Sequence, residues 1–383
     1  MAHSPWSTAY IVVQLLRSML WTIDHGPWTF YYFRSMQFDY LIAGQGIAGT
    51  MLSHRLLQAG QRVLVIDAYK PNSASRIAAG VINPVSGRRF EMAWMYEQLY
   101  PFAKQTYRQM EQLLGVPVFK ERDIWMALPS EQLRTAFNNK TTQGLAQQYT
   151  HPADAALMEP WLHQPYGAAI VKGATVLLHH LLPAWRHYLT EKQLLRDELL
   201  DLTQLQHTAA GVQYKDVKAR AIIFCEGAQI IHNPWFKHIP FLLNKGEVLR
   251  VHIPGLHTEN ILKKSITLVP QEQEVFWAGS TFVWDYVDEA PTPEKRVFLE
   301  ESLQQLLKVP YMVLEQQAGI RPSGKDRRPI MGLHPQYPAL GLFNGLGTKG
   351  CSLAPYMAHL LTQHLLQGVP LLPEADIKRY FNR

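Results

Sequence analysis

The sequence predicts an α/β fold built on a parallel sheet, and three observations lead to that prediction. The chain has 383 residues, of which 47% are apolar and 18% charged, a composition typical of a globular protein with two or three domains. Between residues 38 and 67, a strand-like apolar run, a glycine-rich turn, a helical pattern and a second strand-like run follow one another. Near the C-terminus, a second glycine-rich turn again precedes a helical pattern.

Cysteine content and charge exclude several classes of protein. Cys225 and Cys351 are too few for a disulfide scaffold or a four-thiolate zinc site, and they favour a reducing, cytoplasmic compartment. The net charge of +6, without a run of five basic residues, permits weak attraction to an anionic partner but does not indicate nucleic-acid binding. We expect no metal site, because His187 and Glu191 form the one metal-like pair and no H-E-x-x-H motif is present.

Residues 1–35 differ from the rest of the chain. Their apolar runs are interrupted by Arg17 and Asp24, so neither run reaches the roughly 20 residues that a membrane span needs. We therefore predict no membrane span. We interpret residues 1–35 as an extension or, alternatively, as a mis-assigned start, with Met36 as the true first residue.

Residues 38–67 have the pattern of a dinucleotide-binding unit. A predicted strand, Phe38–Ala43, leads into Gly44–Gly49 with the spacing G-x-G-x-x-G, and a helix and the strand Val63–Ile66 follow. The three glycines permit a tight turn, close approach of a pyrophosphate, and packing of the helix on the strand. Asp67 stands where a carboxylate meets ribose hydroxyls. The pattern predicts a Rossmann-like site but does not distinguish NAD from FAD. Its predicted cofactor-binding residues are Gly44, Gly46, Ile47, Ala48, Gly49 and Asp67.

Four later segments carry a resemblance to a known family. They read SASRIAAGVINP (Ser73–Pro84), ARAIIFCEGA (Ala219–Ala228), AGIRPSGKDRRPIMG (Ala318–Gly332) and FNGLGTKGCSLAP (Phe343–Pro355). In this order and spacing they resemble the D-amino-acid oxidase superfamily of FAD-dependent oxidoreductases, and the third is similar to the matching segment of glycine oxidases. The resemblance implies FAD rather than NAD. It implies non-covalent FAD, because members with covalently bound flavin use a cysteine where this chain has Gly319 or its neighbours.

The resemblance also implies two interleaved domains. A Rossmann-like FAD-binding domain would comprise residues 36–90, 150–230 and 315–383. A substrate domain with a mixed or antiparallel sheet would comprise residues 91–149 and 231–314.

Further cofactor contacts follow from the resemblance. Ser75 and Arg76 would face the pyrophosphate or ribitol, Ala79 and Gly80 would lie against the isoalloxazine, and Gly227 would end a second strand near the cofactor. The C-terminal turn would meet the pyrimidine end of the flavin through Gly345, Gly347, Thr348, Lys349 and Gly350.

Arg321 and Lys349 are the predicted catalytic residues. The resemblance places Arg321 on the substrate carboxylate, which a planar guanidinium can hold with two parallel hydrogen bonds. The turn-forming residues after Arg321 also suit a surface arginine, and Lys349 is interpreted either as a charge beside the reduced flavin or as an exposed loop lysine. Sarcosine oxidases carry a lysine near the flavin where this chain aligns Trp277, a difference that disfavours sarcosine chemistry.

The predicted activity is oxidation of the C–N bond of an amino acid or secondary amine that bears a carboxylate. Hydride would pass to flavin N5, the imine would hydrolyse, and oxygen or another acceptor would reoxidise the flavin. Three alternatives stay open. They are a tRNA-modifying oxidase acting on a carboxymethylaminomethyl group, a dehydrogenase that uses a quinone or carrier, and a flavin-binding scaffold without turnover.

Overall fold

The computed structural model describes residues 36–86, 90–141 and 145–381. The chain divides into two units, Met1–Met36 and Gln37–Arg383, and the fold below is that of the second. The predicted extension, residues 1–35, lies outside the described residues. In the described part of the chain, no helix is both long and apolar enough to cross a membrane.

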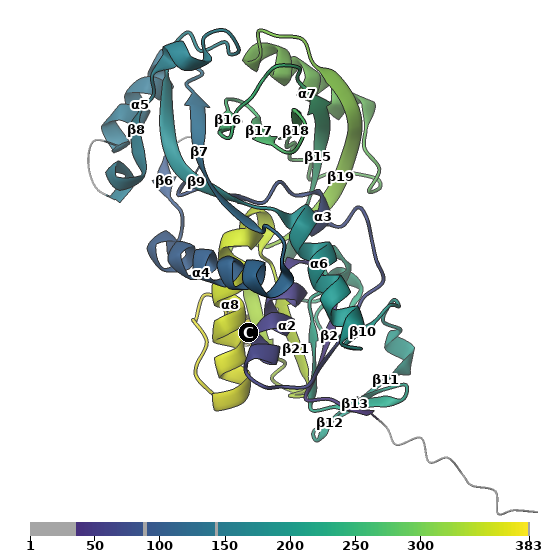
Figure 1. Cartoon of the computed structure of the whole chain (residues 1–383). Coiled ribbons are helices and arrows are strands. Elements are labelled where there is room, and N and C mark those ends of the chain that lie inside the picture. The colour runs from purple at the N-terminus through teal and green to yellow at the C-terminus, as the bar shows by residue number, and fades with distance from the viewer. Residues whose placement is uncertain (1–35, 87–89, 142–144, 382–383) are drawn as a thin grey trace, which may run out of the picture. The chain divides into compact units, whose positions relative to one another are not determined.

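A six-stranded sheet forms the first half of the fold, and its central strands are parallel (Figure 1). Each central strand is a run of four buried residues, as expected for parallel strands covered on both faces. The predicted strand at 38–43 begins two residues later than expected, and the predicted strand at 63–66 is confirmed. In sheet order the strands are β10 (Leu195–Arg196), β3 (Val63–Ile66), β2 (Tyr40–Ala43), β14 (Ala221–Phe224), β21 (Leu340–Asn344) and the antiparallel β20 (Ile330–Leu333).

Different layers cover the two faces of this sheet. Alternate side chains of β2 and β3 pack with the helices on one face, and the intervening ones pack with a small antiparallel sheet on the other. The helices are α2 (Ile47–Gln58), α4 (Tyr96–Leu114), α6 (Leu178–Glu191) and α8 (Gly350–Gln367). The small sheet contains β11 (Leu205–Thr208), β12 (Gly211–Tyr214) and β13 (Val217–Ala219).

A nine-stranded mixed sheet forms the second half of the fold and curves strongly in Figure 1. Its long strands pair antiparallel, whereas β16 and β7 are parallel. In order, the strands are β19 (Met312–Gly324), β15 (Phe241–His252), β18 (Val275–Gly279), β17 (Thr267–Pro270), β16 (Ile261–Lys263), β7 (Phe119–Ala127), β9 (Ala168–Val176) and β4 (Val81–Ile82), with β8 (Thr150–Pro152) beside β9.

Short elements complete the fold. Val85–Ser86 (β5) and Glu91–Met92 (β6) pair antiparallel in a separate two-stranded sheet, and Pro293–Leu306 (α7) packs against β15 and β18. The bounds are α3 (Ala74–Ile77), α5 (Glu131–Thr141), α7 (Pro293–Leu306), β1 (Met36–Gln37), β5 (Val85–Ser86) and β6 (Glu91–Met92).

Several strands of the nine-stranded sheet lie within ranges predicted for the FAD-binding domain. They are β4, β8, β9 and most of β19. The ladder between β15 and β19 runs from Phe241↔Gly324 to His252↔Met312, which carries the GIRPSG segment onto that sheet. The ranges themselves stay a prediction.

Candidate active site

A cavity of about 960 Å³ lies between the two large sheets. This volume is at the upper end of the range for ligand pockets. The residues that follow β3, β2, β14 and β21 all line it, since the carboxyl ends of neighbouring parallel strands meet at one edge of the sheet. The opposite wall comes from β16, β17, β18 and β19 of the nine-stranded sheet. The cavity thus has one wall built by strand ends and another built by a sheet face.

The predicted glycine turn between β2 and α2 forms part of the first wall. Gly44 has φ +101°, and a Cβ there would lie 2.6 Å from the carbonyl oxygen of Cys225. A Cβ on Gly49 would lie 1.9 Å from the carbonyl oxygen of Gly44, so this glycine permits helix packing and does not line the cavity. Gly46 is the N-cap of α2 without a capping side chain, and Ile47 N donates to Ser75 Oγ at 3.0 Å. An uncapped helix N-terminus at a cavity wall suits a pyrophosphate.

Asp67 follows β3 and lines the cavity as predicted. Its two carboxylate oxygens accept hydrogen bonds from Gln45 N at 2.8 Å and from Arg186 Nη1 at 2.7 Å. Because a carboxylate offers about four lone-pair positions, two bonds leave capacity for a ribose hydroxyl. Arg186 was not identified from the sequence, since it lies 119 residues away on α6.

The loop around α3 places the other predicted contacts along the same cavity. Ser75, Arg76, Ala79 and Gly80 all line it. Arg76 donates to Gln45 Oε1 at 3.2 Å and lies over the ring of Tyr69, 4.2 Å from its centroid. A cation is therefore held beside the N-terminus of α2, where the two phosphates of a dinucleotide would need one.

The turn after β21 delivers the N-terminus of α8 to the cavity. Gly347, Thr348, Lys349 and Gly350 line it together with Gly227 from the turn after β14. Gly345 does not line it; its backbone N–H donates to Asn344 Oδ1 at 2.8 Å and shapes the turn at φ +75°. Burial, and the nearby Arg328 and Arg327, lower the pKa of the Lys349 ammonium.

Arg321 on β19 points into the cavity from the opposite wall. Its Nη1 donates to Asn244 Oδ1 at 3.0 Å and to the carbonyl oxygen of Thr281 at 3.4 Å. The guanidinium lies 5.1 Å from the ring centroid of Phe282. A Cβ on Gly246 of β15 would lie only 1.8 Å from Arg321 Nη2, so the absence of a side chain at Gly246 makes room for the guanidinium.

No ion pair joins Arg321 to an acidic side chain of the described residues. Burial lowers the pKa of its guanidinium to about 10, which leaves it charged at neutral pH. Arg321 thus lines the cavity with neutral partners, an environment in which an anion would be well placed. Its role as the contact for a substrate carboxylate stays a prediction.

Glu226 and Lys263 are among the ionisable cavity residues that the sequence analysis did not identify. Glu226 precedes Gly227, accepts from Asn233 Nδ2 at 3.0 Å, and has a pKa that burial raises to about 7. Lys263 ends β16, and burial lowers the pKa of its ammonium. Glu226 lies within the ARAIIFCEGA segment, but that segment carries no predicted role for it. Lys263 lies outside every predicted motif, and its position follows from strand register.

Trp277, aligned with a flavin-proximal lysine of sarcosine oxidases, closes one side of the cavity. Its Nε1 donates to the carbonyl oxygen of Ile77 at 2.8 Å, which ties β18 to the α3 loop. Cys225 and Cys351 also line the cavity; they are free, and burial raises the pKa of Cys225 and raises that of Cys351 to about 12.

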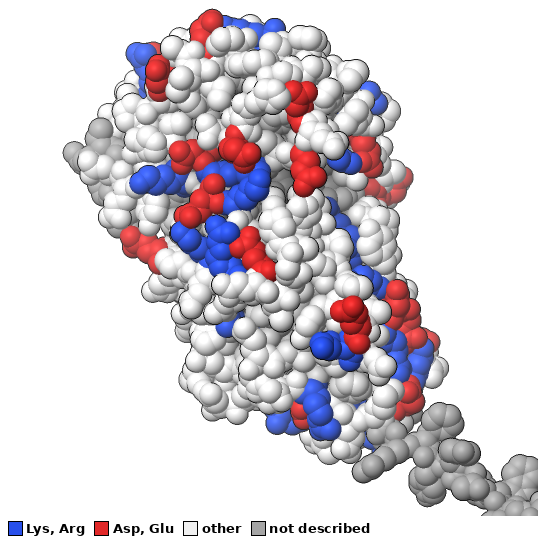
Figure 2. All heavy atoms as spheres, viewed as in Figure 1, with Lys and Arg blue, Asp and Glu red and all other residues white. Residues whose placement is uncertain are grey.

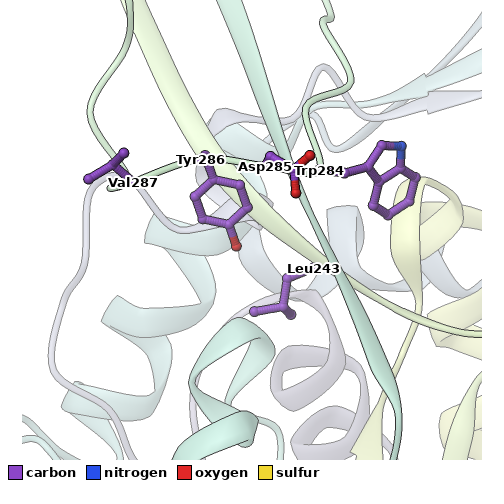
Figure 3. A pocket seen from close by; sticks show the side chains of 5 residues that line it. All are labelled: Leu243, Trp284, Asp285, Tyr286 and Val287. Atoms are coloured by element: carbon purple, nitrogen blue, oxygen red, sulfur yellow. The ribbon is translucent and has the colours of Figure 1, made fainter.

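A strap of residues 283–290 crosses the surface next to this cavity. The buried pair Lys245 and Glu247 holds it, because Lys245 Nζ donates to the carbonyl oxygen of Ala290 and Glu247 accepts from Thr292 N at 2.7 Å. The strap lines a second, open pocket of about 580 Å³, in which the ring of Tyr286 extends toward Leu243 (Figure 3). Val287 on the strap is fully exposed.

Charges of both signs alternate on the face shown in Figure 2, where blue and red side chains lie next to one another. This view shows no continuous basic surface of the kind that a polyanion would need. In the described part of the chain, no group of three or more metal-ligating side chains is present. His187 and Glu191 form a 3.2 Å pair on α6.

Comparison with known proteins places this geometry in a family. A family model described as "FAD dependent oxidoreductase" matches residues 39–364. The chain belongs to this family of FAD-dependent oxidoreductases. The predicted superfamily, the α/β fold with its parallel sheet, and FAD as the cofactor are thereby confirmed.

Individual relatives are distant. A glycine oxidase from Bacillus licheniformis is 23% identical over 366 residues, covering 88% of this chain and 95% of that protein. A shorter match, 34% identical over 76 residues, covers 20% of this chain and 19% of an uncharacterized oxidoreductase from Bacillus subtilis.

Solved structures of similar fold include an iminodiacetate oxidase from Chelativorans sp. BNC1 and a glycine oxidase from Bacillus cereus ATCC 14579. The first has a TM-score of 0.72 and 21% identity, covering 89% of this chain and 98% of that one. The second has a TM-score of 0.74 and 17% identity, covering 87% and 96%. At these identities the likeness shows the fold alone.

The cavity fits the cofactor of the family. The tight glycine turn, the uncapped N-terminus of α2, Arg76 and Asp67 would hold the dinucleotide end of FAD. The N-terminus of α8 and Lys349 would face the flavin end, where negative charge develops on reduction.

Proposed function

We propose that this protein oxidises the C–N bond of an amino acid or secondary amine that bears a carboxylate. The observation that carries the proposal is Arg321, a half-buried cation that points into the FAD cavity and has only neutral partners among the described residues. A guanidinium can hold a carboxylate with two parallel hydrogen bonds and so fix its orientation.

The residues around Arg321 would prepare it for this task. Asn244 and Thr281 engage Nη1, and Phe282 lies over the guanidinium plane, so few rotamers are lost when an anion binds. Bound FAD supplies a two-electron acceptor for the amine carbon. Trp277 and Ile261 contribute apolar surface to the cavity, which favours the neutral form of the amine that oxidation requires.

We further propose that FAD is bound non-covalently and that the protein is cytoplasmic. Both cysteines at the cavity have raised thiol pKa values, which disfavours the thiolate needed to form a covalent bond. Two free thiols also suit a reducing compartment.

Anaerobic absorption spectroscopy of the FAD-loaded protein tests the proposal. The panel would contain glycine, sarcosine, proline, iminodiacetate and both enantiomers of common amino acids. Loss of the oxidised-flavin band with at least one compound is the expected result. Reoxidation in air, or only by an added quinone, then distinguishes an oxidase from a dehydrogenase.

Other outcomes identify the alternatives. A flavin that no small amine reduces, but that tRNA carrying a carboxymethylaminomethyl group reduces, would replace the proposal with the tRNA-modifying activity. A flavin that none of these compounds reduces would favour the scaffold.

A further inference from the structure

The wall of the nine-stranded sheet carries a second cation, Lys263, that the proposed function does not use. It ends β16 and lines the cavity. No hydrogen bond or ion pair joins its ammonium group to another of the described residues. Burial lowers the pKa of this group, as expected for a charge partly removed from water.

The acidic residues at the cavity are already engaged. Asp67 is paired with Arg186, Glu289 with Lys70 at 2.6 Å, and Glu226 accepts from Asn233. None of these carboxylates forms an ion pair with Lys263 in the described part of the chain. An anion bound in the cavity would therefore reach Lys263 without competition from these carboxylates.

Strand register places Lys263 and Arg321 on the same wall. Lys263 lies opposite Thr267, and Thr267 lies opposite Gly279 on β18. Thr281, whose carbonyl oxygen accepts from Arg321, lies two residues beyond Gly279. With about 4.8 Å between strands, the Cα atoms of Lys263 and Gly279 are roughly 10 Å apart, and Thr281 follows Gly279 by two residues. The lysine side chain covers part of that separation, which leaves room for the carbon chain of a small diacid between the two cations.

The dinucleotide has other partners in the same cavity. Arg76 and the N-terminus of α2 lie at the glycine turn, and Lys349 lies at the start of α8, all on the wall formed by the six-stranded sheet. The pyrophosphate therefore does not need Lys263, which stands on the opposite wall beside Ser265 and Thr267.

We propose that Lys263 binds a second anionic group of the substrate, so that the preferred amine carries two anionic groups, one on Arg321 and one on Lys263. This inference rests on the proposed function, because it assigns the first carboxylate to Arg321. The second group is a carboxylate or a phosphate, for which a phosphonate can stand in. A lysine ammonium can bind either of these anions as a point charge.

Binding of non-oxidisable probes to the FAD-loaded protein tests this assignment without turnover. The probes are acetate, glutarate and 3-phosphonopropionate, titrated by flavin absorbance and by calorimetry. Wild-type protein is expected to bind at least one of the two dianions about 10-fold or more tightly than acetate. The stronger of the two identifies the second group.

Lysine variants then locate the second contact. Lys263→Met is expected to weaken dianion binding about 10-fold or more and to change acetate binding less than about 2-fold. Lys263→Arg should retain most of the dianion preference. Arg321→Met should weaken all three probes. FAD content and melting temperature of each variant report whether it has folded.

Equal effects of Lys263→Met on acetate and on the dianions would overturn the assignment, as would wild-type protein that binds dianions no better than acetate. Failure of the proposed function is a separate result. It would appear as a flavin that no amine reduces, while probe binding and its dependence on Lys263 remain as described.

Discussion

The two walls of the cavity differ in how the chain builds them. The wall of the six-stranded sheet consists of turns that follow strand ends. In one of these turns, a Cβ at Gly44 would collide with the backbone of Cys225. The wall of the nine-stranded sheet consists of side chains, Arg321, Lys263 and Trp277, that come from three different strands. Backbone turns suit a cofactor that is the same throughout a family, whereas side chains on a sheet face can change with the substrate.

The largest loss of folding stability is expected from a substitution in the wall formed by turns. Gly44→Ala should cost about 4 kcal/mol or more, because the new Cβ would lie 2.6 Å from the carbonyl oxygen of Cys225 at φ +101°. Urea unfolding and bound-FAD content measure the loss. Gly60→Ala is the matched control, with φ +74° and no atom within 4 Å, and should cost about 1 kcal/mol. Equal losses for the two variants would mean that close approach of the backbone is not what Gly44 provides.

A comparable loss is expected where β15 anchors the strap. Glu247→Gln leaves the buried Lys245 with only the exposed Asp288, 3.9 Å away, as an ionic partner and should cost about 3 kcal/mol in urea unfolding. Glu315→Gln, which disrupts the exposed pair with Arg250, is the control and should cost less than about 1 kcal/mol. A small effect of Glu247→Gln would show that the side-chain wall tolerates loss of its buried pair.

The third prediction concerns ligand affinity on the substrate wall. Arg321→Met should weaken binding of the carboxylate substrate by about 30- to 4,000-fold, since it removes a desolvated charge partner. Bound FAD and stability should change little, because Arg321 projects from the wall opposite the glycine turn. Arg250→Met on β15 serves as a control outside the cavity. If Arg321→Met lost FAD as well as substrate affinity, the two walls would not bind cofactor and substrate independently.

The smallest expected effect is on the pH dependence of folding stability, and it comes from a histidine on α2. His54 on α2 is buried against Trp185, and burial lowers its pKa from the usual 6.5 to about 4. Because the native state keeps this ring neutral, its stability contribution is complete above pH 6.5 and is lost as pH falls toward 4. Between pH 7 and pH 4.5, the free energy of unfolding measured in urea should fall by about 1–3 kcal/mol less in His54→Phe than in the wild-type protein. The exposed His151→Phe is the control. If His54→Phe left the pH dependence of the free energy of unfolding unchanged, burial of His54 would not be its cause.

The two walls of the cavity also differ in how well the sequence predicts them. The turn at Gly44–Gly49 and the strand at 63–66 are local patterns, so this part of the cofactor wall can be predicted from the sequence. Arg321 was predictable only through its GIRPSG segment, and its room beside Gly246 depends on pairing between β15 and β19. Lys263 and Arg186 have no motif at all, because their positions arise from pairing of β16 with β7 and from packing of α6 beside β3, both over long sequence distances.

The central claim is that the cavity selects an amine by its carboxylate. The most direct measurement compares the rate of flavin reduction by the best amine of the panel with the rate for its methyl ester, at equal concentration below saturation. Removing the negative charge should slow reduction of wild-type protein by about 30-fold or more, and should make little difference in Arg321→Met. Equal rates for acid and ester in wild-type protein would contradict the claim.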